Sequence, residues 1–304
     1  MNNSRIIPNL FIVGAPKCGT TAMLNYLGQH PEIFMAKEKE NNHFATDLIP
    51  LIAPFRSDQK YFALFEDARN QKIVGEKSVY YMLSKIAAQN IFRFNPEAKI
   101  IIMLRNPVDM LPSHHAQQIY NGIEDIIDFE EALNAENGRK NGEIKLRESL
   151  RIKRKLFYSE VVSYSEQVER YLSLFGEKQV HIIIYDDFKK DIVDVYKKTL
   201  EFLNVEPTFQ PGFPIINARK TRRHSFHKKF INFPLPFKSF LKSLVPESVQ
   251  QYLFIIFKRM DFTYKQTPPL NPTVKKHLQE IYKPEIQRLS ILLGRDLNYW
   301  WMDA

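Results

Sequence analysis

The 304-residue sequence has a single cysteine, Cys18, and no long apolar stretch. One thiol excludes a disulfide framework and a zinc site built on several cysteines, and it is typical of a reducing compartment. The longest apolar runs, 100–104 and 252–257, are far shorter than the roughly 20 residues that span a bilayer. The amino-terminal segment also lacks the layout of a signal peptide. We therefore expect a soluble, cytoplasmic protein without a transmembrane segment.

Acidic residues are missing from residues 207–246, which hold eight Lys or Arg and no Asp or Glu. The whole chain has 43 basic and 34 acidic residues, so this segment supplies +8 of the net charge of +9. Such a concentration of positive charge indicates an anionic partner. Nucleic acid is disfavoured because no zinc-finger, RRM or basic-zipper pattern accompanies the charge. A small polyanionic ligand is the competing interpretation.

Hydrophobic patterning predicts an α/β fold with a central parallel sheet covered by helices. Short runs rich in β-branched residues indicate buried strands at 10–13, 72–74, 99–104 and 180–185. Apolar residues recur three and four apart, as in amphipathic helices, over 20–29, 158–175 and 189–203. This alternation of strands and helices is typical of a parallel sheet. A late helix is expected over 273–293, broken or kinked near Pro284.

A glycine loop follows the first predicted strand and leads directly into a predicted helix. Its sequence is Gly14-Ala15-Pro16-Lys17-Cys18-Gly19-Thr20-Thr21. Backbone N–H groups at such a turn and the positive end of the helix dipole form a cradle for phosphate, to which Thr20 or Thr21 adds a hydroxyl. The glycine spacing is that of the motif G-x-x-x-x-G-K-[ST], but Thr20 stands where that motif requires lysine. The lysine lies inside the loop instead, as Lys17.

This loop resembles the 5′-phosphosulfate loop of the sulfotransferases that use 3′-phosphoadenosine 5′-phosphosulfate (PAPS). Their pattern, a strand followed by G-x-x-K-[SGC]-G-[ST]-[ST], is matched by Gly14, Lys17, Gly19, Thr20 and Thr21. The resemblance implies that residues 17–21 bind the nucleotide and that Lys17 lies close to the 5′-phosphate and its leaving bridge oxygen. Cys18 takes the small-residue position of the loop, and we interpret it as structural rather than nucleophilic.

A second motif follows the predicted strand 99–104, which ends in Arg105-Asn106-Pro107-Val108-Asp109, with Ser113 eight residues after the arginine. It resembles the 3′-phosphate motif of the same family, R-[ND]-P-x-[DE]-R-x-x-S. The resemblance implies that Arg105, whose planar fork of donors suits a phosphate dianion, and Ser113 hold the 3′-phosphate. Met110 departs from the pattern, which we expect to weaken local salt bridging rather than phosphate contact.

A late basic run, 217–223, resembles in place and charge the family's loop that closes over the nucleotide. Its candidate nucleotide ligands are Arg219, Lys220, Arg222 and Arg223. Which of these four contacts the ligand stays open at this stage.

Sulfuryl transfer needs a base for the acceptor proton and cations for the transferring oxygens and the departing phosphate. Residues 37–47 resemble the family stretch K-E-P-H-F-F-x-x-D, and alignment from Lys39 places Glu40 on the glutamate proposed as the base. A shift by one places His43 on the histidine, so His43 is kept as the alternative base. Glu76-Lys77-Ser78 resembles the family's E-K-[ST]-P, which implies that Lys77 stabilises transition-state charge together with Lys17.

No metal site is expected. Lysines can supply the required cations, and the pairs His114-His115 and His224-x-x-His227 lack a carboxylate or thiol that would complete a ligand set. The histidines are interpreted as polar surface or site-lining residues.

The resemblance covers most of the chain and implies a P-loop-like sulfotransferase fold over residues 1–304, related to bacterial and to carbohydrate and heparan sulfate sulfotransferase domains. It implies in-line, metal-independent transfer from PAPS to a hydroxyl or amine of a carbohydrate or small-molecule metabolite, with release of PAP. Residues 207–270 are expected to form a nucleotide cap and a wall of the acceptor cleft, and the aromatic, lysine-rich part 230–257 leaves peripheral membrane contact open. The alternatives are a magnesium-dependent P-loop kinase of small molecules or nucleosides and a non-enzymatic polyanion-binding protein. The acceptor and the oligomeric state stay open.

Overall fold

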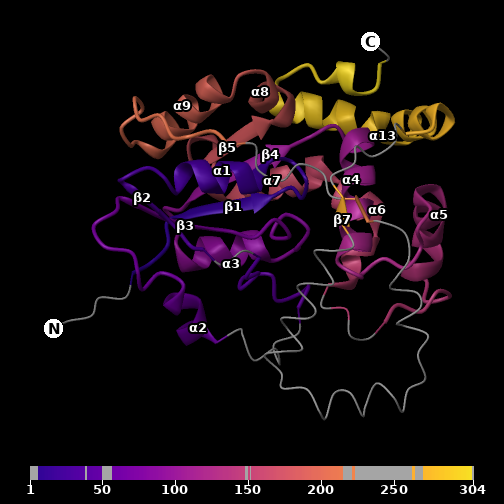
Figure 1. Ribbon diagram of the computed structural model, residues 1–304, viewed down its shortest axis with the longest axis horizontal. Coiled ribbons are helices and arrows are strands. Elements are labelled where there is room, and N and C mark those ends of the chain that lie inside the picture. Colours follow the sequence, from indigo (N-terminus) through magenta and orange to yellow (C-terminus); the bar gives the residue numbers. More distant parts are fainter. Residues whose placement is uncertain are drawn as a thin grey trace. The chain divides into compact units, whose positions relative to one another are not determined.

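The computed structural model describes residues 6–37, 40–49, 57–147, 150, 152–214 and 270–302, and the backbone alone of 221–222 and 262–263. Its centre is a five-stranded parallel sheet in the order β2-β3-β1-β4-β5 (Figure 1). The strands are β1 (Leu10–Gly14), β2 (Ile33–Met35), β3 (Ile73–Lys77), β4 (Lys99–Leu104) and β5 (Val180–Ile184). The predicted α/β architecture with a central parallel sheet is confirmed.

Two strands differ from the predictions. The missed strand β2 has only three residues, too few for a periodic signal, and it forms because it pairs in register with Ile73–Gly75 of β3. Strand β3 continues through Glu76 and Lys77, whose charged side chains argue against a buried strand in sequence. Both are buried in the fold, because each has polar partners there.

Helices cover both faces of the sheet (Figure 1). On one face lie α1 (Thr20–Leu27), α8 (Tyr185–Lys190) and α9 (Ile192–Leu203). The opposite face carries α3 (Ala87–Phe94) and α7 (Tyr164–Phe175), which pack on each other, and α7 also contacts β4 and β5. The inner strands are therefore shielded from water on both sides, as parallel strands usually are.

The remaining elements surround this centre. The helix α4 (Pro107–Tyr120) follows β4, and α13 (Pro272–Leu293) packs against both α4 and α7. The others are α2 (Asp58–Ala63), α5 (Phe129–Lys140), α6 (Tyr158–Val161) and the short 3₁₀ turns η1 (Lys153–Leu156), η2 (Glu177–Gln179) and η3 (Asn298–Trp300).

Helix boundaries correct three expectations. The predicted helix 158–175 is two helices, α6 and α7, and 189–203 contains the junction of α8 and α9 at Asp191. The side chain of Asp191 accepts a hydrogen bond from the backbone N–H of Asp194 and so starts a new helix. At Pro284 the predicted break is wrong, since α13 continues through it. Proline removes one helical hydrogen bond, and packing on α4 and α7 supports the rest.

A second compact unit comprises residues 217–269, and in its described part β6 (Thr221–Arg222) pairs antiparallel with β7 (Phe262–Thr263). The predicted role of residues 207–270 as cap and cleft wall falls largely outside the described residues. Across the described parts of the chain, no helix is both long enough and apolar enough to cross a membrane.

Candidate functional site

The motif residues meet at the carboxyl edge of three adjacent strands. The loop 14–19 follows β1, Lys77 ends β3 and Arg105 follows β4, and β3 and β4 flank β1 on opposite sides. In open parallel sheets, ligands bind at this edge, at the point where the chain connections diverge to the two sides. The strand order therefore places the loop, the second lysine and the arginine around one region.

The glycine loop is built from the main chain between two central strands. The backbone N–H of Ala15 donates to the carbonyl of Met103 at 2.7 Å, which fixes the loop to β4. Gly19 has φ +89°, and a Cβ there would lie 3.2 Å from the ring of Phe188. This left-handed, crowded position requires glycine. Lys17 is also left-handed, with φ 63°.

Helix α1 begins directly after this glycine and has no side-chain cap within the described residues. The first-turn N–H groups of a helix need an external acceptor, and the helix dipole favours an anion there. The loop and α1 therefore present the phosphate cradle that the motif predicts. Of the two hydroxyl candidates, Thr20 is buried and Thr21 is partly exposed.

Lys17 points toward α4, where its Nζ donates to Oε1 of Gln117 at 3.2 Å. Gln117 lies one helical turn beyond Ser113, so the two side chains share a face of α4. Ser113 is buried on this helix, which starts at Pro107 immediately after the Arg105 motif. The first and second motifs are thus joined through one helix.

Arg105 is held by an aromatic ring. Its guanidinium carbon lies 4.9 Å from the ring centroid of Tyr185, the first residue of α8. Stacking of this kind fixes the plane of a guanidinium without using its N–H donors. Among the described residues, the Tyr185 ring is the partner found for this guanidinium, so its N–H donors can serve an anion.

Cys18 follows Lys17 in the glycine loop and contacts the backbone of Arg105. Burial raises the pKa of its thiol to about 12, while the charge of Arg105, the Tyr164 hydroxyl, the Arg105 backbone N–H and the charge of Lys17 act in the opposite direction. The thiol therefore stays protonated and unreactive near neutral pH. The bond from the Arg105 backbone N–H to this thiol joins the glycine loop to the start of the second motif.

Glu40 and Lys77 form an ion pair beside this cradle. One Glu40 carboxylate oxygen pairs with the Lys77 ammonium, and the other accepts the Val79 N–H at 2.9 Å. The Lys77 side chain is only 3% exposed, so its charge depends on a partner, whereas Glu40 is 33% exposed. This carboxylate is therefore held from one side and open to solvent on the other, as a proton acceptor for a bound substrate must be.

His43, the alternative base, lies against α2. Its ring stacks on Tyr61 at a centroid distance of 4.2 Å, and Nε2 is 3.5 Å from Oδ1 of Asp58. Glu40 pairs with Lys77 at the end of β3, whereas these contacts turn His43 toward the surface helix α2. The geometry favours Glu40 over His43 as the group next to Lys77.

The adjacent histidines of α4 are buried and do not lie on the polar surface. Nε2 of His114 is 2.8 Å from the carbonyl of Lys155, and Nε2 of His115 is 2.9 Å from that of Ile126. Burial lowers the pKa of His114 to about 4, so this ring is neutral at physiological pH. The Lys155 ammonium lies 4.1 Å from the ring centroid of Tyr80.

Sequence reasoning missed two supporting residues, Gln117 and Tyr185. The four-residue spacing from Ser113 could have indicated Gln117, because such residues share a helix face. Tyr185 was assigned to the end of a strand, and only the parallel pairing of β4 with β5 places it beside Arg105. Of the late basic run, Arg219, Lys220 and Arg223 lie outside the described residues, and Arg222 is described by its backbone alone.

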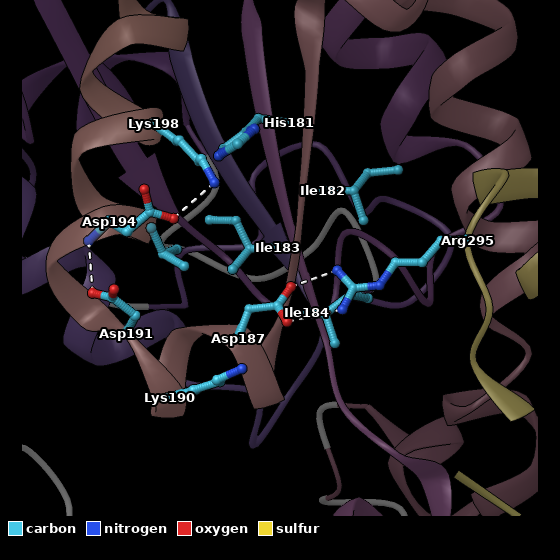
Figure 2. A pocket seen from close by; sticks show the side chains of 11 residues that line it. His181, Ile182, Ile183, Ile184, Asp187, Lys190, Asp191, Asp194, Lys198 and Arg295 are labelled. Carbon is cyan, nitrogen blue, oxygen red and sulfur yellow. Dashed lines mark hydrogen bonds and ion pairs between the residues drawn. The ribbon is translucent and has the colours of Figure 1, made fainter. Parts of the chain in front are cut away.

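A hollow of about 540 Å³ lies elsewhere, along β5 and the helices α8 and α9 (Figure 2). Four of its charged groups form two ion pairs, Asp187 with Arg295 and Asp194 with Lys198 (Figure 2). The hydrogen bonds from Arg295 lower the pKa of Asp187. None of the predicted site residues lines this hollow, so it is separate from the site at the glycine loop.

Comparison with known proteins identifies the family of the chain. The family model described as a sulfotransferase domain matches residues 8–289. Among solved structures, a sulfotransferase from Alicyclobacillus acidocaldarius has 28% sequence identity and a TM-score of 0.73. That match covers 98% of this chain and 100% of the other.

Curated relatives include enzymes that modify glycans. Heparan sulfate glucosamine 3-O-sulfotransferase 5 of Mus musculus is 24% identical over 309 residues, which cover 96% of this chain and 74% of that protein. Carbohydrate sulfotransferase 15 of Mus musculus is 23% identical, covering 72% of this chain and 48% of its own length. The membrane-associated sulfotransferase kil1 of Dictyostelium discoideum is 31% identical over 107 residues, 34% of this chain and 21% of that protein. The match thus spans about a fifth of the length of kil1 and about half of that of carbohydrate sulfotransferase 15.

Proposed function

The chain belongs to the sulfotransferase family, and from this membership we propose that it transfers a sulfuryl group from PAPS to a hydroxyl or amine of a carbohydrate or small-molecule metabolite. The observation that supports the proposal is the placement of the glycine loop after β1 and of Arg105 after the adjacent strand β4, with Lys17 donating to Gln117 on the helix that follows Arg105. A nucleotide with phosphates at both its 3′ and 5′ positions needs two such separated cationic groups.

Different groups at the donor end of the site would bind the two phosphates of the nucleotide. The N–H groups at the start of α1 and the Lys17 ammonium would hold the 5′-phosphosulfate. Arg105 and Ser113 would hold the 3′-phosphate, with Tyr185 keeping the guanidinium in its plane. The late basic run would add further donors, from Arg219, Lys220, Arg222 or Arg223.

Glu40 and Lys77 would carry the transfer itself. The acceptor oxygen or nitrogen forms a bond to sulfur while the bond from sulfur to the bridging oxygen of the 5′-phosphate breaks. The acceptor proton passes to the Glu40 carboxylate, and the electron pair of the broken bond stays on the phosphate of the departing PAP. Lys77 stabilises the transferring oxygens and Lys17 the phosphate, where negative charge increases.

A carbohydrate acceptor is the favoured class. The curated relatives are named for heparan sulfate and carbohydrate substrates. The positive segment 207–246 fits an acidic glycan as well as a nucleotide. Metabolites with a free hydroxyl or amine remain the second class.

A ligand titration tests the donor. PAP is expected to raise the melting temperature of the protein in a saturable way, and ATP with magnesium to raise it much less. Stabilisation by ATP with magnesium but not by PAP would contradict the proposal in favour of a kinase. Stabilisation by long polyanions alone, strongly reduced by salt and retained in Lys17→Ala, would instead identify a polyanion-binding protein.

An acceptor screen with sulfate-labelled donor then tests the chemistry. Label is expected on an acceptor hydroxyl or amine, at a rate that EDTA leaves unchanged. PAP binding without transfer to any glycan or metabolite of a broad panel would contradict the proposed acceptor class while leaving the donor assignment intact.

A further inference from the structure

Glu76 is a buried carboxylate that the proposed transfer does not use. Its residue is 1% exposed, and it accepts hydrogen bonds from three hydroxyls. Tyr61 and Tyr81 donate to Oε1 at 2.9 and 2.8 Å, and Ser78 donates to Oε2 at 3.0 Å. A carboxylate taken out of water needs such donors. Tyr61 comes from α2, whereas Ser78 and Tyr81 come from one turn directly after β3.

Two of these hydroxyls also hold the base loop, which we define as residues 40–44. Ser78 Oγ accepts the backbone N–H of Asn42 at 3.0 Å, and Tyr81 Oη accepts that of Phe44 at 3.5 Å. The third hydroxyl, on Tyr61, donates to Glu76 but bonds no backbone N–H of the loop within the described residues, and the Tyr61 ring contacts the loop only through side chains, stacking on His43. Ser78 and Tyr81 are therefore relays between the buried carboxylate and the loop that carries Glu40.

The negative charge of Glu76 sets the direction of the hydrogen bonds made by the Ser78 and Tyr81 hydroxyls. A carboxylate only accepts, so the hydroxyl protons of Ser78 and Tyr81 must point toward Glu76. Their lone pairs then face the loop, where the two backbone N–H groups need acceptors. The loop requires such support because Glu40 and Asn42 both have left-handed backbones, with φ 64° and 56°.

We propose that Glu76 is a positioning residue, which through the Ser78 and Tyr81 hydroxyls orients the base loop and so places the Glu40 carboxylate beside Lys77. Its catalytic consequence rests on the proposed function, because it assumes that Glu40 accepts the substrate proton. The conformational consequence stands apart from that assumption and can be measured without a substrate.

Residue-resolved hydrogen exchange at pH 8.5 tests the conformational consequence. Burial raises the pKa of Glu76 to about 7, so the group is a carboxylate under these conditions. In Glu76→Gln the amide NH₂ is a donor facing hydroxyl donors, and at least one relay must turn. Exchange of at least one of the Asn42 and Phe44 amides, the one whose relay turns, is expected to accelerate roughly tenfold, the effect of one lost hydrogen bond. The Ser78 amide, which donates to the Ile12 carbonyl at 3.1 Å, is expected to be unaffected.

Single relay variants make the test independent of how well Glu76→Gln folds. Ser78→Ala is expected to accelerate exchange at Asn42 only, and Tyr81→Phe at Phe44 only. The matched control is Tyr61→Phe, which removes a donor to Glu76 but no contact with the loop backbone, and both amides are expected to keep their exchange rates. Unchanged exchange in Ser78→Ala and Tyr81→Phe, or equal acceleration in Tyr61→Phe, would overturn the proposal.

Kinetics separates positioning from a general packing role. Glu76→Gln and Ser78→Ala are each expected to lower kcat about tenfold while KM for PAPS stays within about twofold. The double variant is expected to be no slower than the slower single variant, because both changes break one relay. Additive losses would contradict action through Ser78. If the wild-type protein transfers no sulfuryl group, the proposed function fails, while the exchange data still decide the role of Glu76.

Discussion

The glycine loop, 14–19, follows β1, and the base loop, 40–44, is bonded to the end of the adjacent strand β3. Both loops contain left-handed residues. They are stabilised by different means. The glycine loop is held by main-chain bonds to β4 and by a glycine that the space and φ require. The base loop has one main-chain bond to β3, from the Glu40 N–H to the Lys77 carbonyl at 3.1 Å, and is otherwise held by side chains, namely the relays from Glu76 and the ion pair with Lys77.

This difference explains what each loop can do. A cradle of main-chain N–H groups is set by the backbone and changes little when one side chain is lost. A carboxylate held by hydroxyl relays and one lysine depends on each of them, so its position responds to single substitutions. We therefore expect nucleotide binding and transfer rate to separate in the following variants, taken from the largest effect to the smallest.

Glu40→Gln is expected to have the largest effect, because it should lower the transfer rate while leaving nucleotide binding in place. The amide keeps the shape and one acceptor but cannot take the substrate proton, so kcat should fall about 10²- to 10⁴-fold. PAP affinity should stay within about threefold of wild type, since the glycine loop is untouched. Single-turnover rates and calorimetric PAP titrations measure the two quantities. Glu177→Gln, an exposed carboxylate on η2, is the matched control, and near-wild-type turnover in Glu40→Gln would show that another group is the base.

Arg105→Ala, in contrast to Glu40→Gln, is expected to weaken PAP binding. Loss of charge-assisted hydrogen bonds of about 1.5–3 kcal/mol should lower affinity roughly 10- to 100-fold. Arg105→Lys should lie between the two, because lysine keeps the charge but not the planar fork. Isothermal titration gives the affinities, with Lys178→Ala at an exposed position as the control. Equal affinity of wild type and Arg105→Ala for PAP would remove Arg105 from the nucleotide site.

The pH dependence of the free energy of unfolding reports on Glu76, the residue that supports the base loop. Burial raises the pKa of Glu76 to about 7, against 4.5 in the unfolded chain. The native state therefore binds the extra proton between these values, and this group makes the free energy of unfolding fall as pH rises from 4.5 to 7. The histidines work oppositely, because burial lowers the pKa of His114 to about 4.

The Glu76 contribution is isolated by comparing wild type with Glu76→Gln. The stability advantage of wild type over the variant is expected to shrink by an amount on the order of 1–3 kcal/mol between pH 4.5 and 8. Urea unfolding at several pH values measures it. Parallel pH profiles for the two proteins would mean that Glu76 titrates at the same pH when folded and unfolded.

Tyr185→Leu carries the smallest expected effect. Loss of the ring under Arg105 should cost about 0.5–1 kcal/mol, which is a two- to fivefold weaker PAP affinity. Tyr185→Phe retains the ring and should bind like wild type. If both variants lose affinity equally, the hydroxyl rather than the ring is what matters.

Much of the donor side could be predicted from the sequence. The strand 99–104 matches β4 in both boundaries, and the loop ends where α1 begins. These features depend on local properties, since a glycine forced by positive φ and a short apolar strand leave their pattern in consecutive residues. The base loop gave a weaker signal, and the alignment left both Glu40 and His43 open. The structure favours Glu40 because of its pairing with a lysine 37 residues further along the chain.

Sequence alone determined the parallel α/β class and predicted a phosphate-type loop and its basic residues, because short-range order and composition record these properties directly. Only the tertiary structure decided that Tyr185 supports Arg105, that Gln117 receives Lys17 and that Glu76 reaches the base loop through hydroxyls. Each of these contacts joins separate strands or helices, and their side chains meet only after the sheet has assembled and water has been excluded.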